Sequence, residues 1–361
     1  MQTKTYHAFG LMSGTSLDGL DIAYCKFEKT DDKWSYEIVE AETITYPTDI
    51  SNYLKEGITL SGIKLRTIDL KLGYWMGEQV KVFKNKYLVR AQFVASHGHT
   101  IFHQPENNLS LQIGDLNALH AASELPVIGD FRTLDIMKGG QGAPLVPAGD
   151  QLLFSEFEIC LNLGGIANLS YYTEKGNRIA YDVSVCNLLL NKLASSEGFD
   201  YDEDGKMAAS GTPNEDFLKQ LNTINYYKHA APKSLGLEQI EAEVFPLFRK
   251  SSESTSNMLA TAVEHIAEQI ARCIKSHIKE GKVLITGGGA RNSFLMKRLQ
   301  QKLGTTIQVA EVPNKLIDYK EALIFAFLGV LKLRNETNVF SSVTGATSDS
   351  ISGVQVGKFS I

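Results

Sequence analysis

Apolar and polar side chains alternate along the first part of the chain in a way that is typical of β-strands. The alternation covers residues 6–12, 20–27 and 34–46, and predicts an antiparallel meander whose first two strands are joined by a glycine-containing turn. A helical period follows over residues 65–87, with apolar side chains at Leu65, Ile68, Leu72, Trp75, Met76, Val80 and Phe83. Beyond it we expect a short buried strand over 93–95, a helix over 116–123 opened by Asp115, and a strand over 126–129.

The second part of the chain repeats this order. Strands are predicted over residues 158–163, 166–172 and 178–183, with Gly164 and Gly165 in the turn between the first two. An amphipathic helix over 256–280, ended by Gly281, leads to a strand over 283–285 and to helices over 293–303 and 320–332. The recurrence of strand, glycine turn and strand predicts an α/β fold with an internal duplication of its architecture.

The length of 361 residues favours two domains over a single hydrophobic core. A Gly/Pro-rich stretch over 138–144 indicates the approach to a connection between them. We therefore expect one domain over residues 1–145 and a second over 146–361, with a return of the last ~20 residues to the first domain left open.

The composition narrows the class of protein. A hydrophobic content of 43% and a charged content of 21% are typical of globular domains, and a net charge of −5 argues against a nucleic-acid partner. The chain has no apolar stretch of about 20 residues and no signal-peptide core at its start, so we expect no membrane partner. The four cysteines lack a CxxC spacing, which favours a cytoplasmic protein with reduced thiols and no structural zinc.

Three glycine-rich turns, each after a short apolar run, carry the candidate chemistry. They are Ser13-Gly14-Thr15-Ser16, Gly164-Gly165 and Gly287-Gly288-Gly289. Glycine lets backbone N–H groups approach an anion closely, so three such turns in one chain suggest clamps on a polyphosphate and hence an ATP-dependent phosphotransferase. Taken singly, each has a plainer alternative, which is a tight hairpin for the first two turns and a plain βα turn for the third.

The first turn belongs to the segment GLMSGTSLDGLD, Gly10 to Asp21, which is not a Walker A loop because no Gly-Lys-Ser/Thr follows. Its hydroxyl and N–H groups suit β- and γ-phosphates, and Asp18 and Asp21 suit Mg²⁺ held through water. The alternative is that both carboxylates only stabilise the turn.

Four further side chains are candidates for sugar chemistry. Asp182 lies at the end of a predicted strand, where a carboxylate suits a general base, although a helix N-cap is a serious alternative. His97 and His99 flank a glycine and suit hydrogen bonds to a sugar or phosphate, or a plain loop. Arg132 suits a ligand carboxylate, or a local salt bridge with Asp130 or Asp135.

Together these motifs resemble the anhydro-N-acetylmuramic acid kinase family, bacterial sugar kinases of the actin/hexokinase/Hsp70 ATPase superfamily. The similarity extends over nearly the whole chain, and MSGTSLDG followed by GGQGAPLVP is its most specific part. The segments that carry it are MSGTSLDGLD (12–21), SHGHT (96–100), QIGD (112–115), DFR with GGQGAPLVP (130–147), LNLGGIANLS (161–170), AASG (208–211), PKS (232–234), GGGARN (287–292), KEALIFAFL (320–328) and VTGA (343–346).

The resemblance implies two actin-like (ribonuclease H-like) domains with a nucleotide cleft between them. It implies an enzyme that uses ATP and Mg²⁺ to open the 1,6-anhydro ring and phosphorylate O6 in peptidoglycan recycling, as a cytoplasmic homodimer. Asp182 would activate the water, and Asp18 would hold the metal through water. His97, Asp115 and Arg132 would bind the sugar, whose lactyl carboxylate suits a cation. The implied ATP phosphate ligands are Gly14, Thr15, Ser16, Leu17, Asp18, Gly19, Asp21, Gly164 and Gly165, and the adenosine edge is Gly287, Gly288, Gly289 and Asn292.

Three departures from the family pattern keep two alternatives open. Asp182 is followed by Val-Ser-Val-Cys-Asn where the family usually has Thr-Gly-Pro-Gly/Ala-Asn, Leu235 and Leu237 stand where Thr and Arg are usual, and His99 stands where Gln is usual. One alternative is a kinase of another amino sugar on the same fold. The other is a nucleotide-binding sensor or partner module with weak catalysis.

Overall fold

The chain divides into two compact α/β units. The computed structural model describes residues 4–14, 17–231 and 233–359. Unit 1 takes in Met1–Leu153 and Tyr319–Ile361, and unit 2 takes in Phe154–Asp318. This division differs from the predicted domains at both limits, because residues 146–153 and the whole segment from Tyr319 onward belong to unit 1.

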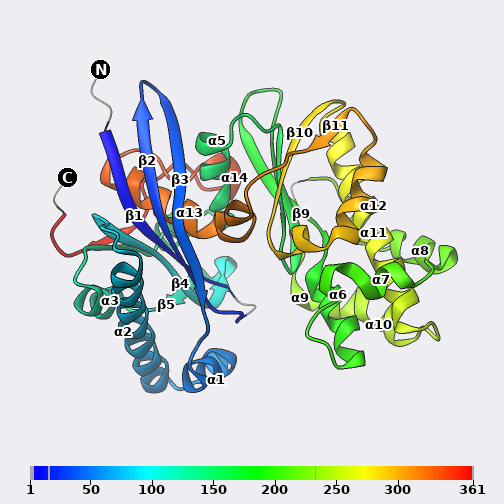
Figure 1. Cartoon of the computed structure of the whole chain (residues 1–361), viewed down its shortest axis with the longest axis horizontal. Helices are drawn as coiled ribbons and strands as arrows, with labels where there is room; N and C mark the ends of the chain where they lie inside the picture. Colours follow the sequence, from blue (N-terminus) through cyan, green and yellow to red (C-terminus); the bar gives the residue numbers. More distant parts are fainter. Residues whose placement is uncertain (1–3, 15–16, 232, 360–361) are drawn as a thin grey trace. The chain divides into compact units, whose positions relative to one another are not determined.

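A sheet forms the centre of unit 1 (Figure 1). Its strands are β1 (Lys4–Ser13), β2 (Leu20–Thr30), β3 (Lys33–Ile44), β4 (Phe93–Gln104), β5 (Leu109–Ile113), β6 (Val127–Gly129) and β12 (Val354–Val356). They run in the order β12-β6-β4-β1-β2-β3, with β5 beside β4. The predicted meander is confirmed, since β1, β2 and β3 pair antiparallel, whereas β4 is parallel to β1 and to β6.

Helices cover both faces of the unit 1 sheet. They are α1 (Thr48–Glu56), α2 (Gly62–Tyr87), α3 (Leu116–Ser123), α4 (Thr133–Met137), α5 (Val146–Leu153), α14 (Ser341–Thr344) and the part of α13 (Asn314–Leu333) that follows Tyr319, where α13 is kinked. Because successive side chains of a strand point to opposite faces, Phe9 meets Phe83 of α2 at 5.6 Å between ring centroids, while Gly10 faces α13.

The close approach of α13 explains why the C-terminal segment returns to unit 1. A Cβ on Gly10 would lie 1.8 Å from the carbonyl oxygen of Ala322, so only glycine lets the helix backbone come this near. The rings of Phe27 and Phe327 pack at 5.3 Å beside this contact. The apolar face of α13 is thus part of the unit 1 core, which the sequence pattern alone did not assign.

One predicted loop of unit 1 lies inside a strand. We expected the strand at residues 93–95 to end at Ser96, but β4 continues to Gln104 because residues 99–104 pair with β5. Two irregularities accompany this extension. Gly98 has a φ of 72°, and the pairing of β1 with β4 shifts register between Leu11 and Ser13, which brings Ser13 opposite His99.

Unit 2 repeats the strand order of unit 1. Its strands are β7 (Ile159–Leu163), β8 (Ile166–Tyr172), β9 (Arg178–Val185), β10 (Gly281–Thr286) and β11 (Ile307–Val309). They run β11-β10-β7-β8-β9, with β7, β8 and β9 antiparallel and β10 parallel to β7 and β11. The order β9-β8-β7-β10-β11 matches β3-β2-β1-β4-β6, so the predicted α/β fold of two ribonuclease H-like units is confirmed.

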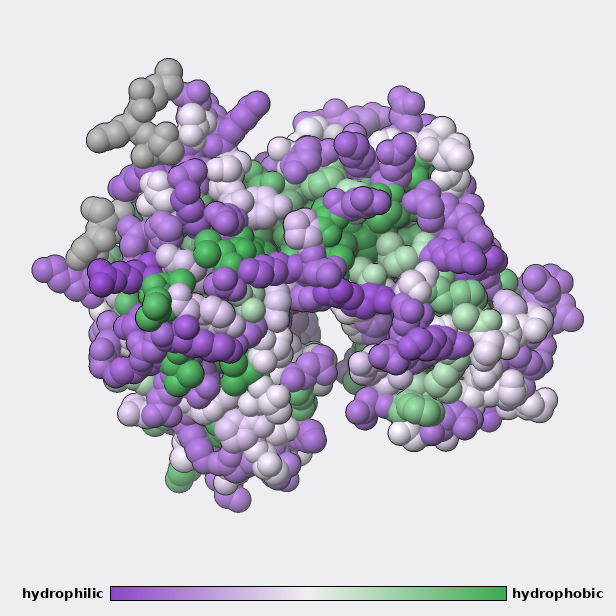
Figure 2. Space-filling model, in the orientation of Figure 1, coloured by the Kyte–Doolittle hydropathy of each residue, from purple (hydrophilic) through white to green (hydrophobic). Residues whose placement is uncertain are grey.

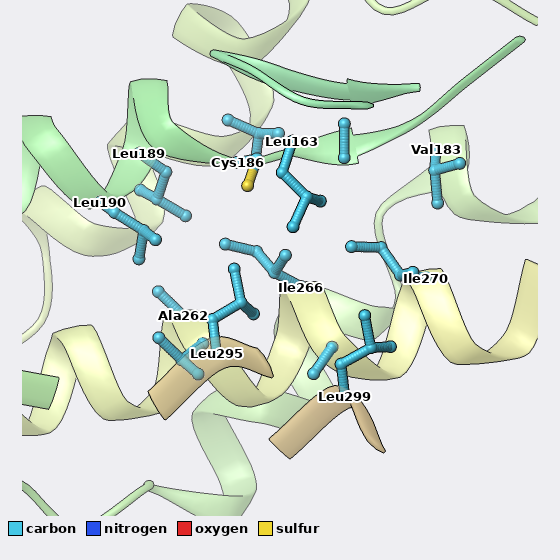
Figure 3. Packing of buried hydrophobic residues seen from close by; sticks show 14 of the residues in the cluster. Leu163, Val183, Cys186, Leu189, Leu190, Ala262, Ile266, Ile270, Leu295 and Leu299 are labelled. Atoms are coloured by element: carbon cyan, nitrogen blue, oxygen red, sulfur yellow. The ribbon is translucent and has the colours of Figure 1, made fainter. Parts of the chain in front are cut away.

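The core of unit 2 forms around one long helix. The helices are α6 (Asn187–Ala194), α7 (Lys206–Ser210), α8 (Glu215–Asn222), α9 (Leu237–Gln239), α10 (Phe245–Arg249), α11 (Thr255–His277) and α12 (Ser293–Leu303). In α11 the apolar stripe that includes Ile266 and Ile270 is buried, and Figure 3 shows Ile266 pointing toward Leu163 of the sheet. The predicted end of this helix at Gly281 is wrong, because Ile278 is already extended and Gly281 opens β10.

Among the described residues no helix is long and apolar enough to cross a bilayer. The face drawn in Figure 2 is covered largely by hydrophilic residues, with apolar patches between them.

Candidate functional site

The first glycine turn joins β1 to β2 in unit 1. Leu17 has a φ of 62°, and its N–H donates to the carbonyl of Gly14 at 3.2 Å. A Cβ on Gly19 would lie 2.7 Å from the carbonyl oxygen of Ile44, so the turn is tightly seated on β3. Thr15 and Ser16, two of the predicted phosphate ligands, lie outside the described residues. A phosphate-binding role for this turn stays a prediction, and so does the alternative of a plain tight hairpin.

The two carboxylates of this turn differ in their surroundings. Asp18 is exposed, while Asp21 lies at the start of β2 and accepts a hydrogen bond from Thr43 Oγ1 at 2.6 Å. The described residues contain no group of three or more His, Cys, Asp or Glu side chains placed to hold a metal. An exposed carboxylate fits Mg²⁺, because this ion keeps most of its waters and needs only one or two protein oxygens.

A chain of buried hydrogen bonds lies beside the turn. Tyr46 Oη and Ser13 Oγ are 2.5 Å apart, and Ser13 Oγ is 2.8 Å from Nδ1 of His99. Burial lowers the pKa of His99 to about 4, so its ring is neutral at neutral pH. Burial, with smaller effects from Asp21 and Asp18, raises the pKa of Tyr46 to about 12. This chain fixes the end of β1 where the glycine turn begins.

His97 and Arg132 are hydrogen-bonded to each other in unit 1. Nε and Nη2 of Arg132 donate to Nε2 of His97 at 3.2 and 2.8 Å, and Nδ1 of His97 donates to the carbonyl of Gly98 at 2.9 Å. His97 is 6% exposed, and its burial together with the Arg132 charge holds its pKa well below the usual value. The imidazole is therefore neutral, with its proton on Nδ1.

A further network holds Arg132 in place. Its Nη1 donates to the carbonyl of Gly142 at 2.6 Å, and the N–H of Gly142 donates to Oδ2 of Asp135 at 2.8 Å. Oδ1 of Asp135 accepts from Thr344 Oγ1 at 2.7 Å. The alternative of a salt bridge from Arg132 to Asp130 or Asp135 is wrong, because Asp130 caps the N–H of Thr133 and Asp135 takes these neutral donors instead.

Arg132 retains hydrogen-bonding capacity. Of the five N–H groups of a guanidinium, these contacts leave one on each terminal nitrogen without a recorded partner among the described residues. Burial lowers the pKa of Arg132 to about 10, so it stays charged at neutral pH, and the nearby Glu321 favours that charge. A charged group with two available donors suits a carboxylate ligand.

Asp115 has a structural role in the same unit. Its Oδ1 accepts from the N–H of Ala118 at 2.8 Å and caps α3, as the sequence predicted, and its Oδ2 pairs with Arg66 at 2.8 Å. Burial raises its pKa, but these donors outweigh burial and the net shift is downward. Among the described residues no contact joins Asp115 to His97 or Arg132, so its predicted sugar contact stays a prediction.

Unit 2 brings the other two glycine turns together. Strands β10 and β7 are parallel neighbours, and Thr286 of β10 lies opposite Asn162 of β7. The turn that begins at Gly287 after β10 therefore lies beside the Gly164-Gly165 turn after β7. Asn187 lies between them. Its N–H donates to the carbonyl of Gly164 at 3.1 Å and its Nδ2 donates to the carbonyl of Leu163 at 3.0 Å, while a Cβ on Gly288 would lie 3.7 Å from the same Nδ2. The two turns and the start of α6 thus form one surface of unit 2.

At two positions on this surface, neither crowding by neighbouring atoms nor a left-handed backbone conformation requires the glycine that is found there. A Cβ on Gly164 or Gly288 would meet nothing closer than 3.5 or 3.7 Å, and neither residue has a positive φ. Beside them, Thr286 is 1% exposed, and its Oγ1 has no hydrogen-bond partner among the described residues. Glycines that leave the backbone accessible and an unsatisfied buried hydroxyl both fit a polar ligand such as a nucleotide. Asn292, in contrast, caps α12 through its Oδ1.

Asp182 lies within β9 rather than at a strand end. The alternative of a helix N-cap is wrong, because α6 begins at Asn187 after Cys186. Oδ2 of Asp182 accepts from the N–H of Leu235 at 2.9 Å and from Ser234 Oγ at 3.2 Å. Burial raises the pKa of Asp182, and these two donors partly offset the effect. A carboxylate that titrates closer to neutrality than usual suits a general base.

Several of these residues were not singled out from the sequence. Ser234 and Thr344 stand in the segments PKS and VTGA, whose roles the pattern left open, and each acts on a partner far away in the chain. Ser13 was named only as part of the first glycine turn and Asp135 only as a possible salt-bridge partner of Arg132, and Tyr46 was not singled out.

Comparison with known proteins agrees with these features. A family model described as anhydro-N-acetylmuramic acid kinase matches residues 6–358. A protein of that name from Actinobacillus pleuropneumoniae serotype 3 is 36% identical over 353 residues, covering 93% of this chain and 95% of its own. Another from Sulfurimonas denitrificans is 34% identical over 367 residues, covering 95% and 97%.

A solved structure is similar at lower identity. The activator of the 2-hydroxyisocaproyl-CoA dehydratase from Clostridium difficile, determined with bound ADPNP, is 16% identical with a TM-score of 0.44, covering 91% of this chain and 97% of its own.

Proposed function

The chain belongs to the anhydro-N-acetylmuramic acid kinase family, and from this premise we propose the reaction that it catalyses. It opens the 1,6-anhydro ring of 1,6-anhydro-N-acetylmuramic acid with water and phosphorylates O6 with ATP. The products are N-acetylmuramic acid 6-phosphate and ADP, and the activity serves the recycling of peptidoglycan sugars. The observation that carries the proposal is Asp182, a partly buried carboxylate with a raised pKa and one oxygen without a recorded partner among the described residues.

The chemistry requires two coupled displacements. Water attacks the anomeric carbon C1, and a carboxylate oxygen of Asp182 takes its proton. The bond from C1 to O6 breaks, O6 attacks the γ-phosphorus, and the bond from that phosphorus to the bridging oxygen breaks to leave ADP. The raised pKa of Asp182 helps here, because a stronger base drives the proton transfer more effectively at neutral pH.

The binding groups divide between the two units. In unit 2, the backbone at Gly164, Gly165 and Gly287–Gly289 is proposed to clamp phosphates and adenosine, with Thr286 Oγ1 as a further ligand. In unit 1, the turn from Gly14 to Asp21 is proposed to take the terminal phosphates, and Arg132 the lactyl carboxylate of the sugar.

Mg²⁺ is proposed to bind at Asp18 through water, where it would neutralise charge on the β- and γ-phosphate oxygens. A homodimeric state and a cytoplasmic location also belong to the proposal, and they rest on the resemblance to the family.

The test is turnover in ¹⁸O-labelled water. Purified protein is incubated with Mg·ATP and the anhydro sugar, and the product is read by mass spectrometry. We expect a 6-phosphate that carries one ¹⁸O, with ADP formed in equal amount. Asp182→Asn is expected to lower kcat by about 10²- to 10⁴-fold and to keep ATP binding. ATP binding without any product from wild type would refute the assigned substrate, and unchanged turnover in D182N would remove Asp182 from the mechanism.

A further inference from the structure

Asp182 lies at the outer edge of the unit 2 sheet, where another segment of the same unit covers it. Strand β9 is the last in the order β11-β10-β7-β8-β9, so its outer edge has no neighbouring strand. Tyr226 and residues 233–235 take that place at Asp182. The N–H of Asp182 donates to the carbonyl of Lys233 at 3.1 Å, and its carbonyl accepts from Tyr226 Oη at 2.6 Å. Both backbone polar groups of Asp182 are thus paired at this outer edge.

The same segment holds the carboxylate, and it does so unequally. Both side-chain contacts, from the N–H of Leu235 and from Ser234 Oγ, go to Oδ2. Oδ1 has no recorded partner among the described residues. Tyr226 and Leu235 are buried in the unit 2 core, and Nζ of Lys233 donates to the carbonyl of Tyr226 at 3.0 Å, so the segment is anchored at both ends.

Burial raises the pKa of Asp182, and the two donors to Oδ2 are the main groups that lower it again. The other charged and titratable groups nearby contribute little. The ammonium of Lys233 lies over the Tyr226 ring at 4.4 Å, and burial raises the pKa of Tyr226 itself. On α11, burial lowers the pKa of His265 to about 3, lowers that of His277 and raises that of Cys273, so all three are neutral at neutral pH. Strand β8 contributes Asn168 opposite Asp182, a residue without charge.

We propose that Ser234 is a positioning residue for ring opening, whose hydroxyl holds Oδ2 of Asp182 so that Oδ1 is the oxygen that takes the proton from water. This inference rests on the proposed function. A carboxylate gripped at one oxygen cannot rotate to exchange its oxygens without breaking two hydrogen bonds, and the lone pairs of Oδ1 stay available. The donated hydrogen bond also favours the ionised form that a base requires.

The kinetic test compares Ser234→Ala with Ser234→Thr, which keeps a hydroxyl. Ser195→Ala is the matched control, because Ser195 is exposed in the same unit and, among the described residues, its Oγ bonds only the carbonyl of Lys192. The profile of kcat/KM for the anhydro sugar against pH reports the ionisation of the base on its acid side. In S234A that side moves to higher pH and kcat falls, whereas KM for ATP is unchanged. S234T and S195A keep the wild-type profile. Coincident profiles for S234A and wild type would overturn the proposal, as would an equal loss at every pH.

A second measurement does not depend on turnover. Carboxyl ¹³C resonances of labelled aspartate are titrated in wild type and S234A, and the signal missing from Asp182→Asn identifies Asp182. We expect a higher titration midpoint in S234A than in wild type. An unchanged midpoint would overturn the proposal even in an active enzyme. If the midpoint moves but wild type lacks kinase activity, the assigned reaction fails and the hold of Ser234 on Asp182 stands.

Discussion

Gly288 offers a test that separates ligand binding from folding. Gly288→Ala adds a methyl group whose nearest neighbour is Nδ2 of Asn187 at 3.7 Å, an ordinary contact, and the φ of Gly288 is not in the left-handed region. At such a position alanine lowers the entropy of the unfolded chain and stabilises the fold by about 0.4–1 kcal/mol. For a unit of this size that corresponds to a rise in Tm of roughly 1–4 °C.

The same methyl group is expected to weaken ATP binding. If the backbone at Gly288 touches the nucleotide, an added methyl overpacks the contact by about 1–3 kcal/mol. The Kd for ATP then rises about 5- to 140-fold. Gly289→Ala is the contrasting variant. Its Cβ would lie 2.7 Å from Cβ of Leu163 and 3.0 Å from the Leu163 carbonyl oxygen, so it destabilises the protein without ligand by about 1–3 kcal/mol.

Two measurements decide the matter. Thermal unfolding without ligand gives the stability of each variant, and calorimetric titration with a non-hydrolysable ATP analogue gives the Kd. Wild-type affinity in a folded Gly288→Ala variant would refute nucleotide contact at this glycine. A lower Tm than wild type would refute the reasoning that its place in the fold is open.

Three other predictions concern unit 1. Thr344→Val leaves Oδ1 of the buried Asp135 without its donor, so it lowers the free energy of unfolding by about 1–3 kcal/mol. In steady-state kinetics it raises KM for the sugar more than KM for ATP. Thr344→Ser restores the stability and both KM values, and equal changes in the two KM values of Thr344→Val would contradict a role through Arg132. Asp18→Ala raises the Mg²⁺ concentration needed for half-maximal rate while leaving KM for the sugar unchanged, whereas an unaltered metal requirement would make Asp18 a turn residue only. Because burial lowers the pKa of His99 to about 4 from a value near 6.5 in the unfolded chain, the unfolded state binds more protons between these values and stability is lost as pH falls from about 6.5 toward 4. His99→Gln removes this titration, so urea unfolding at pH 7 and pH 5 differs less in the variant than in wild type, and equal differences would show that His99 is not the group that titrates.

Periodicity predicted best the elements whose ends are set by residues next to them in the sequence. The helices at 116–123 and 293–303 and the strand at 166–172 have the predicted bounds, because caps and turns next to them decide where they begin and end. The extension of β4 to Gln104 depends instead on a hairpin with β5 through polar residues, which no apolar pattern indicates. The assignment of α13 to unit 1 depends on a glycine more than 300 residues earlier, Gly10.

The candidate site shows the same limit. Its glycine turns and charged side chains could be read from the sequence, because their residue types carry the chemistry. The residues that hydrogen-bond to these side chains could not be predicted from the sequence, because Ser234 is 52 residues from Asp182 and Thr344 is 209 residues from Asp135. A hydroxyl at such a separation has the same appearance in a sequence as any surface serine or threonine. Asp182 itself was placed at a strand end with a helix cap as the alternative, but β9 continues to Val185, and Tyr226 and Lys233 pair with the backbone of Asp182.

The return of α13 to unit 1 has a consequence for the order in which a ribosome releases the protein. Unit 2 is one continuous stretch, Phe154–Asp318, so all of its residues are available before those from Tyr319 onward are made. The β1–β4 part of unit 1 is synthesised first, yet the face of Gly10 and Phe27 waits for Ala322 and Phe327 near the end of translation. The earlier-made unit is therefore the later one to complete its core, and until then its sheet offers nascent apolar surface to chaperones.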